Sequence, residues 1–94
     1  MLSEEKLLKT LSRLGDLFEY SSKEAKTDER MEAFESAHQK CKTIMVYVER
    51  HDISSAVNAW KALEYFVNDS IGGRESFLEK YQPIKQSIIN LGLR

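Results

Sequence analysis

The sequence predicts an all-α fold, a small antiparallel bundle of about four helices that forms a single domain over residues 1–94. Three observations predict it. Apolar residues recur at alternating steps of three and four along nearly the whole chain, which places them on one face of a helix. Residues that cap or stop helices separate the apolar stretches. No segment alternates apolar and polar residues as a half-buried strand does.

The first half of the chain predicts two helices. The first begins after Ser3, a preferred N-cap residue, and Gly15 lies on its apolar face, where a neighbouring backbone can come close. The second begins after Thr27, another N-cap residue, and ends near His51. Each stripe keeps its phase, so each predicts one unbroken helix. The two stripes are Leu7, Leu11, Leu14 and Phe18, then Met31, Phe34, His38, Cys41, Met45 and Val48.

The third segment is apolar around more than half of its circumference. It begins after Asp52, an N-cap residue, and ends at Ser70–Gly73, where glycine favours a stop. Its main stripe is Ala56, Val57, Trp60, Leu63 and Val67, and a second sector holds Ala59, Ala62 and Phe66. A helix this apolar has neighbours on more than one side. We therefore expect it to be the central helix of the bundle or to be partly covered by another chain, with Trp60 in the core.

The last segment predicts a helix that is kinked at Pro83 and closed by Gly92. Its stripe is Phe77, Tyr81, Ile84, Ile88 and Leu91. The stripe passes through Pro83 without a change of phase, which favours one bent helix over two separate pieces. The short connections between all four helices predict antiparallel neighbours.

Composition excludes several classes of protein. The 14 Lys and Arg residues nearly balance 15 Asp and Glu residues, so no polybasic arm for nucleic acid is present. Cys41 is the only cysteine, which excludes a disulfide scaffold and fits a reducing compartment. No run approaches the roughly 18 apolar residues of a membrane span, and the N-terminus does not resemble a secretory signal. We expect a soluble, cytoplasmic protein that binds neither nucleic acid nor membrane.

No motif predicts catalysis or metal binding. Glu35 and His38 have the Glu-x-x-His spacing of di-metal helical bundles, but the second such motif is missing. His38 and Cys41 lie one turn apart, yet a structural zinc site needs more ligands of the right kind than the sequence supplies. Cys41 lies within an apolar stripe, where a reactive thiolate is disfavoured. We therefore expect no enzyme, no cofactor and no metal.

Glu64 is the most unusual charged residue, because it falls within the core sector of the third segment. A carboxylate there needs a partner or an edge position. Lys61 or a basic residue on a neighbouring helix can provide the partner, and an edge position is the favoured interpretation. Together with His38, which lies at the edge of its own stripe, Glu64 is a candidate polar site.

These features predict a small non-enzymatic protein–protein interaction module: a regulator, an inhibitor, an immunity-type protein or an accessory subunit. Several large apolar residues lie off the main stripes, where a small monomer leaves them exposed. They are Val46, Tyr65, Leu78, Ile89 and Leu93. The candidate interaction residues are Val46, Tyr65, Phe66 and Ile89.

The expected partner is another protein or a second copy of the chain. A homodimer is favoured, with Tyr65 and Phe66 as anchors, because aromatic residues dominate interface energetics. The alternative is a ligand- or metal-binding helical bundle that uses His38, Cys41 and Glu64.

Overall fold

The computed structural model describes residues 4–71 and 75–93, and within this part of the chain it contains helices and no strand. The helices are α1 (Glu4–Glu24), α2 (Asp28–Glu49), α3 (Ile53–Phe66) and α4 (Glu75–Asn90), and a π-helical segment, η1 (Val67–Ile71), continues α3. The predicted small helical bundle is confirmed. The predicted cap at Ser3 and the predicted stop at Gly72 and Gly73 lie outside the described residues.

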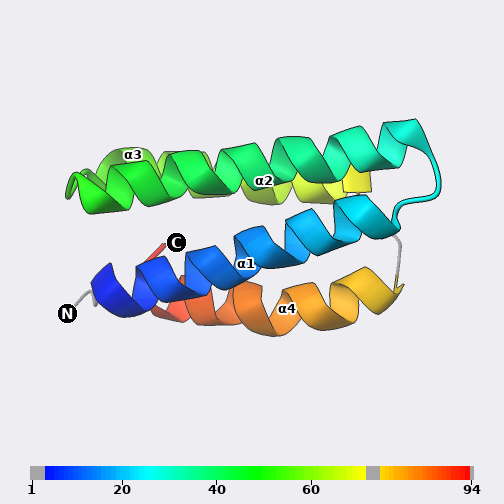
Figure 1. The fold of residues 1–94 in the computed structure, drawn as a ribbon. Coiled ribbons are helices and arrows are strands. Elements are labelled where there is room, and N and C mark those ends of the chain that lie inside the picture. The colour runs from blue at the N-terminus through cyan, green and yellow to red at the C-terminus, as the bar shows by residue number, and fades with distance from the viewer. Residues whose placement is uncertain (1–3, 72–74, 94) are drawn as a thin grey trace.

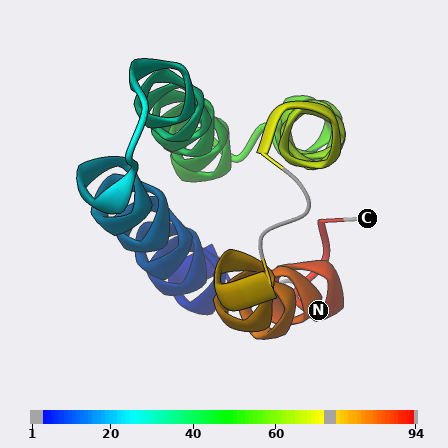
Figure 2. The ribbon, with the colours of Figure 1, turned by 90° about the vertical axis from the view of Figure 1, so that its right-hand side faces the viewer.

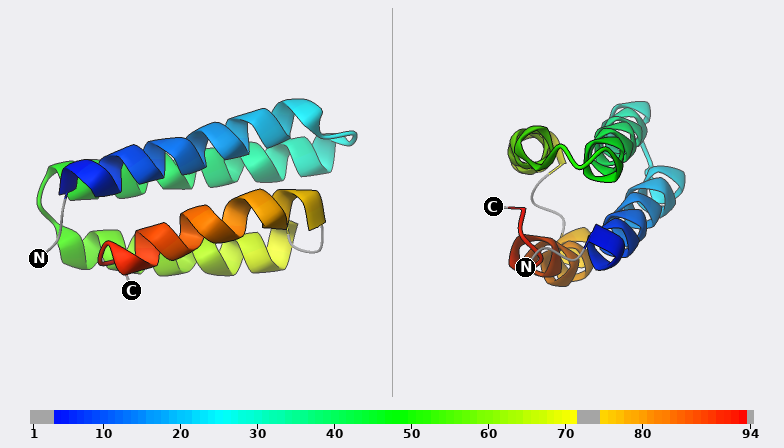
Figure 3. Two further views of the ribbon diagram at one scale, coloured as in Figure 1. Left: turned by 90° about the horizontal axis from the view of Figure 1, so that it is seen from below. Right: turned by 90° about the vertical axis from the view of Figure 1, so that its left-hand side faces the viewer.

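The four helices run lengthwise through a molecule of 40 × 20 × 19 Å (Figure 1). Seen along the long axis, they form an arc in the order α3, α2, α1, α4 (Figure 2; Figure 3, right). Helix α1 packs against α2 and α4, and α2 packs against α1 and α3. The two ends of the arc, α3 and α4, have no pair of Cα atoms within 8 Å of each other.

This arrangement corrects two expectations. Helices α3 and α4 follow each other closely in the sequence but are not direct neighbours, because α4 packs against α1 instead. Helix α3 is also not central: among the described helices, α1 and α2 occupy the middle of the arc and α3 lies at one end. Part of its wide apolar surface packs against the core through Ala59 and Phe66, whereas Ala62 and Tyr65 are exposed.

Large side chains close the distance between α3 and α4. Trp60 of α3 and Tyr81 of α4 are the two largest fully buried side chains. Burial, and next the carboxylate of Glu64, raise the pKa of the Tyr81 hydroxyl above its usual value. The Glu64 Oε2 atom in turn lies 4.0 Å from the Lys85 Nζ atom of α4. The predicted burial of Trp60 is confirmed, at 0 % exposure.

Leu93 corrects a further expectation, because it is fully buried rather than exposed. Gly92 adopts a left-handed φ of 122°, which turns the chain back toward the core. The N–H of Gly92 donates to the oxygen of Ile89 at 3.1 Å, and the N–H of Leu93 donates to the oxygen of Ile88 at 3.3 Å. The turn places this tail on the open side of the arc, between α3 and α4 (Figures 2 and 3).

Side-chain caps hold the first turns of α2 and α3 as predicted. The Thr27 side chain accepts a hydrogen bond from the N–H of Arg30 at 3.2 Å. The Asp52 side chain accepts one from the N–H of Ser55 at 3.2 Å. Helix α4 continues through Pro83 as one helix, and its kink stays a prediction. The π-helical segment η1 was not predicted, and the Arg30 guanidinium anchors it by donating to the oxygen of Ile71 at 3.3 Å.

The turn between α2 and α3 depends on His51. This residue has a left-handed φ of 61°, a conformation that favours glycine. Its N–H donates to the oxygen of Val48 at 3.0 Å, and the N–H of Asp52 donates to the oxygen of Tyr47 at 2.9 Å, which is the hydrogen-bond pattern of a Schellman motif. The His51 Nδ1 atom lies 2.7 Å from a carboxylate oxygen of Glu4.

We expect Trp60→Ala to lower the free energy of unfolding by about 3–5 kcal/mol, because it leaves a large cavity in the core. Urea denaturation followed by circular dichroism measures the change. The control is Tyr20→Ala on α1, which removes an exposed ring away from α3 and should cost less than about 1 kcal/mol. Equal effects of the two substitutions would contradict the assigned burial.

We expect His51→Gly to be more stable than His51→Ala by about 1 kcal/mol. Both variants lose the contact with Glu4, so their difference reports only on the left-handed backbone, which alanine adopts with strain and glycine without it. Thermal denaturation of the two variants measures it, with the glycine variant melting about 4 °C higher. A higher melting temperature for the alanine variant would contradict the strain at this turn.

Candidate interaction surface

Helix α3 combines a peripheral position with an unusually low charge. Only Lys61 and Glu64 are charged among its 14 residues. Its inward side is fully buried through Ala56, Trp60 and Leu63. Because α3 packs closely only on α2, the opposite side of the helix faces solvent while carrying few charges to hydrate it.

The solvent side of α3 presents an exposed aromatic ring. Tyr65 is 73 % exposed, the largest fraction among the exposed large apolar residues of the described chain. Beside it, Ala62 is exposed, and Ala59 and Phe66 are half-buried. We call these four residues the α3 outer surface. A tyrosine flanked by alanines gives a flat surface on which a partner can approach closely.

A lysine of α2 covers one edge of the α3 outer surface. The Lys40 Nζ atom lies 4.9 Å from the centroid of the Phe66 ring, in a cation–π arrangement. Phe66 also packs against the core. Of the two predicted anchors, Tyr65 is therefore the accessible one, and Phe66 is half-buried.

The other predicted interaction residues lie elsewhere. Val46 is 43 % exposed near the last turn of α2, and because α2 and α3 are antiparallel it lies toward the opposite end of the bundle from Tyr65. Ile89 is half-buried on α4 and packs against the core. Tyr65 and Phe66 are consecutive residues of α3, whereas Val46 and Ile89 lie on other helices.

His38 and Cys41 both lie at the interface between α1 and α2. A Cβ atom at Gly15 would lie 3.3 Å from the His38 Cδ2 atom, so the glycine permits the close approach that the sequence predicts. The Cys41 thiol donates to the backbone oxygen of Leu11 at 3.1 Å. Burial raises the pKa of the Cys41 thiol to about 12. The thiol is thus a neutral core group, and His38 is half-buried beside it.

Glu64 lies at a different edge of the molecule. It is half-buried and faces Lys85 of α4, a basic residue on another helix as the sequence analysis expects. His38, Cys41 and Glu64 do not converge, and the described residues contain no group of three His, Cys, Asp or Glu side chains that could hold a metal ion. The candidate polar site of His38 and Glu64 is therefore two separate structural positions.

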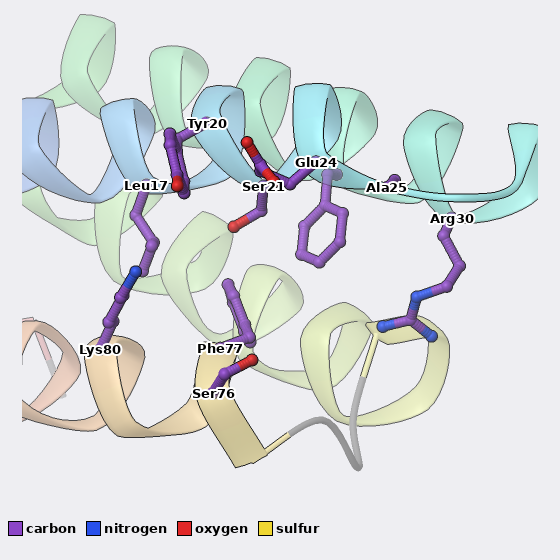
Figure 4. A pocket seen from close by; sticks show the side chains of 10 residues that line it. Leu17, Tyr20, Ser21, Glu24, Ala25, Arg30, Ser76, Phe77 and Lys80 are labelled. Atoms are coloured by element: carbon purple, nitrogen blue, oxygen red, sulfur yellow. The ribbon is translucent and has the colours of Figure 1, made fainter.

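A small hollow of about 220 Å³ opens at the end of the bundle where α1, α2 and α4 meet (Figure 4). The rings of Phe34 and Phe77 line it and lie 5.2 Å apart between their centroids. The Lys80 Nζ atom lies 5.2 Å from the centroid of the Tyr20 ring at its rim. Three helices contribute to this hollow, so no periodic pattern within one helix signals it in the sequence.

Comparison with protein-family models, characterised proteins and solved structures gives no match to this chain. None of the described helices has the length and apolar content needed to cross a membrane. The geometry of the described residues is therefore the basis for a functional proposal.

The buried thiol of Cys41 predicts alkaline destabilisation. The unfolded chain releases the thiol proton near its ordinary pKa of 9.0, whereas the native chain retains it to about 12. Stability is thus fully present below pH 9, and it falls above that value by up to about 1.4 kcal/mol per pH unit. Urea denaturation at several pH values between about 8 and 10, a range that spans the thiol pKa of the unfolded chain, measures this slope.

Cys41→Ala is the control for this slope. The variant is less stable than the wild type at every pH because of the lost packing. Between pH 9 and pH 10, the ordinary pKa values of cysteine and tyrosine, its stability should decline less than that of the wild type. Above pH 10 the buried Tyr81 hydroxyl, whose pKa is also raised, adds a decline to both proteins. Parallel curves between pH 9 and pH 10 would contradict a Cys41 contribution.

Proposed function

We propose that the chain is a non-enzymatic protein–protein interaction module that self-associates through the α3 outer surface. The observation that carries the proposal is the 73 % exposure of Tyr65 on a helix at the end of the arc. In this role the chain acts as a regulatory protein or accessory subunit through its surface, without chemistry of its own.

The position of α3 supports an external partner. A helix that is apolar around more than half of its circumference needs cover on more than one side. Within the described chain α3 has close backbone contact with α2 and with its own continuation η1 only. Ala59 and Phe66 are half-buried against the core, and cover for the exposed Ala62 and Tyr65 is supplied in this proposal by another polypeptide.

A second copy of the chain is the partner that the charges favour. The net charge is −1, so no strong field selects a partner of opposite sign. The α3 outer surface itself is bordered by residues of both signs, which a two-fold pairing can match. Tyrosine is among the residue types that contribute most to the free energy of such interfaces.

The alternative function, ligand or metal binding by His38, Cys41 and Glu64, has no geometric support. The Cys41 thiol is occupied with the Leu11 oxygen, and Glu64 lies beside Lys85 on another face.

Sedimentation equilibrium tests the proposal at micromolar concentration. We expect a mass near twice the chain mass of 10.9 kDa, and we expect Tyr65→Glu to return it to the monomer value while circular dichroism shows unchanged helicity. A buried glutamate without a partner makes association unfavourable. The matched control is Tyr20→Glu, which alters another exposed tyrosine, on α1, and should leave the dimer intact.

A wild-type chain that sediments as a monomer would overturn self-association. A dimer that survives Tyr65→Glu would place the interface on another surface. Loss of the dimer in both tyrosine variants would show that association responds to charge in general rather than to the α3 outer surface.

A further inference from the structure

Three exposed side chains form a row along the solvent side of α3 and η1. Lys61 lies one helical turn before Tyr65, and Asp69 lies one turn after it. Neither Lys61 nor Asp69 forms an ion pair with another residue of the described chain. The row therefore carries an aromatic ring between one positive and one negative charge.

The π-helical geometry of η1 aligns Asp69 with this row. In an α-helix, four residues advance the side chain by about 40° beyond a full turn. A π turn closes hydrogen bonds to the fifth residue and rotates less per residue, and Val67–Ile71 adopts this geometry. Asp69 is thereby turned back toward the line through Tyr65. Segments of this kind recur at functional positions.

The surface beside Asp69 has an excess of acidic groups. A hollow between the first turns of α2 and η1 is lined by Glu29, Glu32 and Asp69, together with Phe66. Arg30 also lines it, and its guanidinium donates to the Ile71 oxygen. One end of the row is thus acidic, and the other end carries the ammonium group of Lys61.

We propose that two copies of the chain pair antiparallel through the row of Lys61, Tyr65 and Asp69, about a two-fold axis at Tyr65, so that Lys61 of each copy faces Asp69 of the other. In an antiparallel helix pair, the residue four positions before the crossing point faces the residue four positions after it. Lys61 and Asp69 hold these positions, each about 6 Å along the axis from Tyr65. A parallel pair would instead place like charges together.

This pairing rests on the proposed self-association and adds the relative orientation of the two copies. Because a two-fold interface uses the same patch on both copies, the Lys61–Asp69 pair forms twice. The two tyrosine rings meet at the axis, and the exposed Ala62 leaves room for them. The charge pairs set the register of the helices, while the rings supply the apolar contact.

Charge reversal tests the orientation by sedimentation equilibrium. Lys61→Glu and Asp69→Lys each place like charges opposite one another at two sites, and we expect each to raise the dissociation constant about tenfold. The double variant exchanges the two charges and should restore the wild-type constant. An equimolar mixture of the two single variants should form a heterodimer of near wild-type affinity, because both of its pairs are attractive.

The matched control is Lys9→Glu, which reverses an exposed charge on α1 and should leave the dissociation constant unchanged. Circular dichroism verifies helicity in every variant. A dimer whose constant does not respond to either single reversal would overturn the antiparallel pairing while the proposed self-association stands. Failure of the double variant to recover affinity would also overturn the pairing. A wild-type monomer would overturn both the pairing and the self-association.

Discussion

Gly15 of α1 faces His38 and Cys41 of α2 without a side chain of its own, so the two helices lie close enough for the Cys41 thiol to donate to the Leu11 oxygen. The other two helices depend on this pair. Helix α4 packs against α1 and α3 packs against α2, and neither makes close backbone contact with the other. A larger residue at position 15 would have to displace the His38 ring. The distance between α1 and α2 therefore depends on this contact.

The open side of the arc is closed by apolar side chains rather than by charge. Trp60 and Tyr81 are fully buried there, and the tail residue Leu93 is buried with them. The Glu64–Lys85 pair is half-exposed at 4.0 Å, a separation and setting in which an ion pair contributes about 0–1 kcal/mol. The Trp60 indole N–H has no hydrogen-bond partner within the described chain, so its burial depends on packing alone. The packing on this side of the arc is therefore stable only while the rings of Trp60 and Tyr81 remain buried.

The arc also explains why the proposed interaction surface lies on α3. A closed bundle would cover α3 on two sides, whereas an arc leaves one terminal helix with a single close neighbour. Its remaining side keeps a low charge and an exposed tyrosine, features that raise the tendency of a surface to associate. The π-helical segment adds an aligned carboxylate at the end of that side. The proposed dimer is thus a consequence of helix order in space and of one local change in helical geometry.

The sequence by itself determined what short-range physics controls. Steps of three and four define the helices, the side chains of Thr27 and Asp52 cap them, and the apolar surroundings of Trp60 mark it as buried. The sequence predicts only one feature of the candidate site, the exposure of Tyr65, from its place on the polar side of its helix. Only the tertiary structure decided that α3 lies at the end of the arc and that the turn at Gly92 buries Leu93. The order of the helices in space depends on which apolar faces pack against each other, and the residues that form those faces lie far apart in the chain.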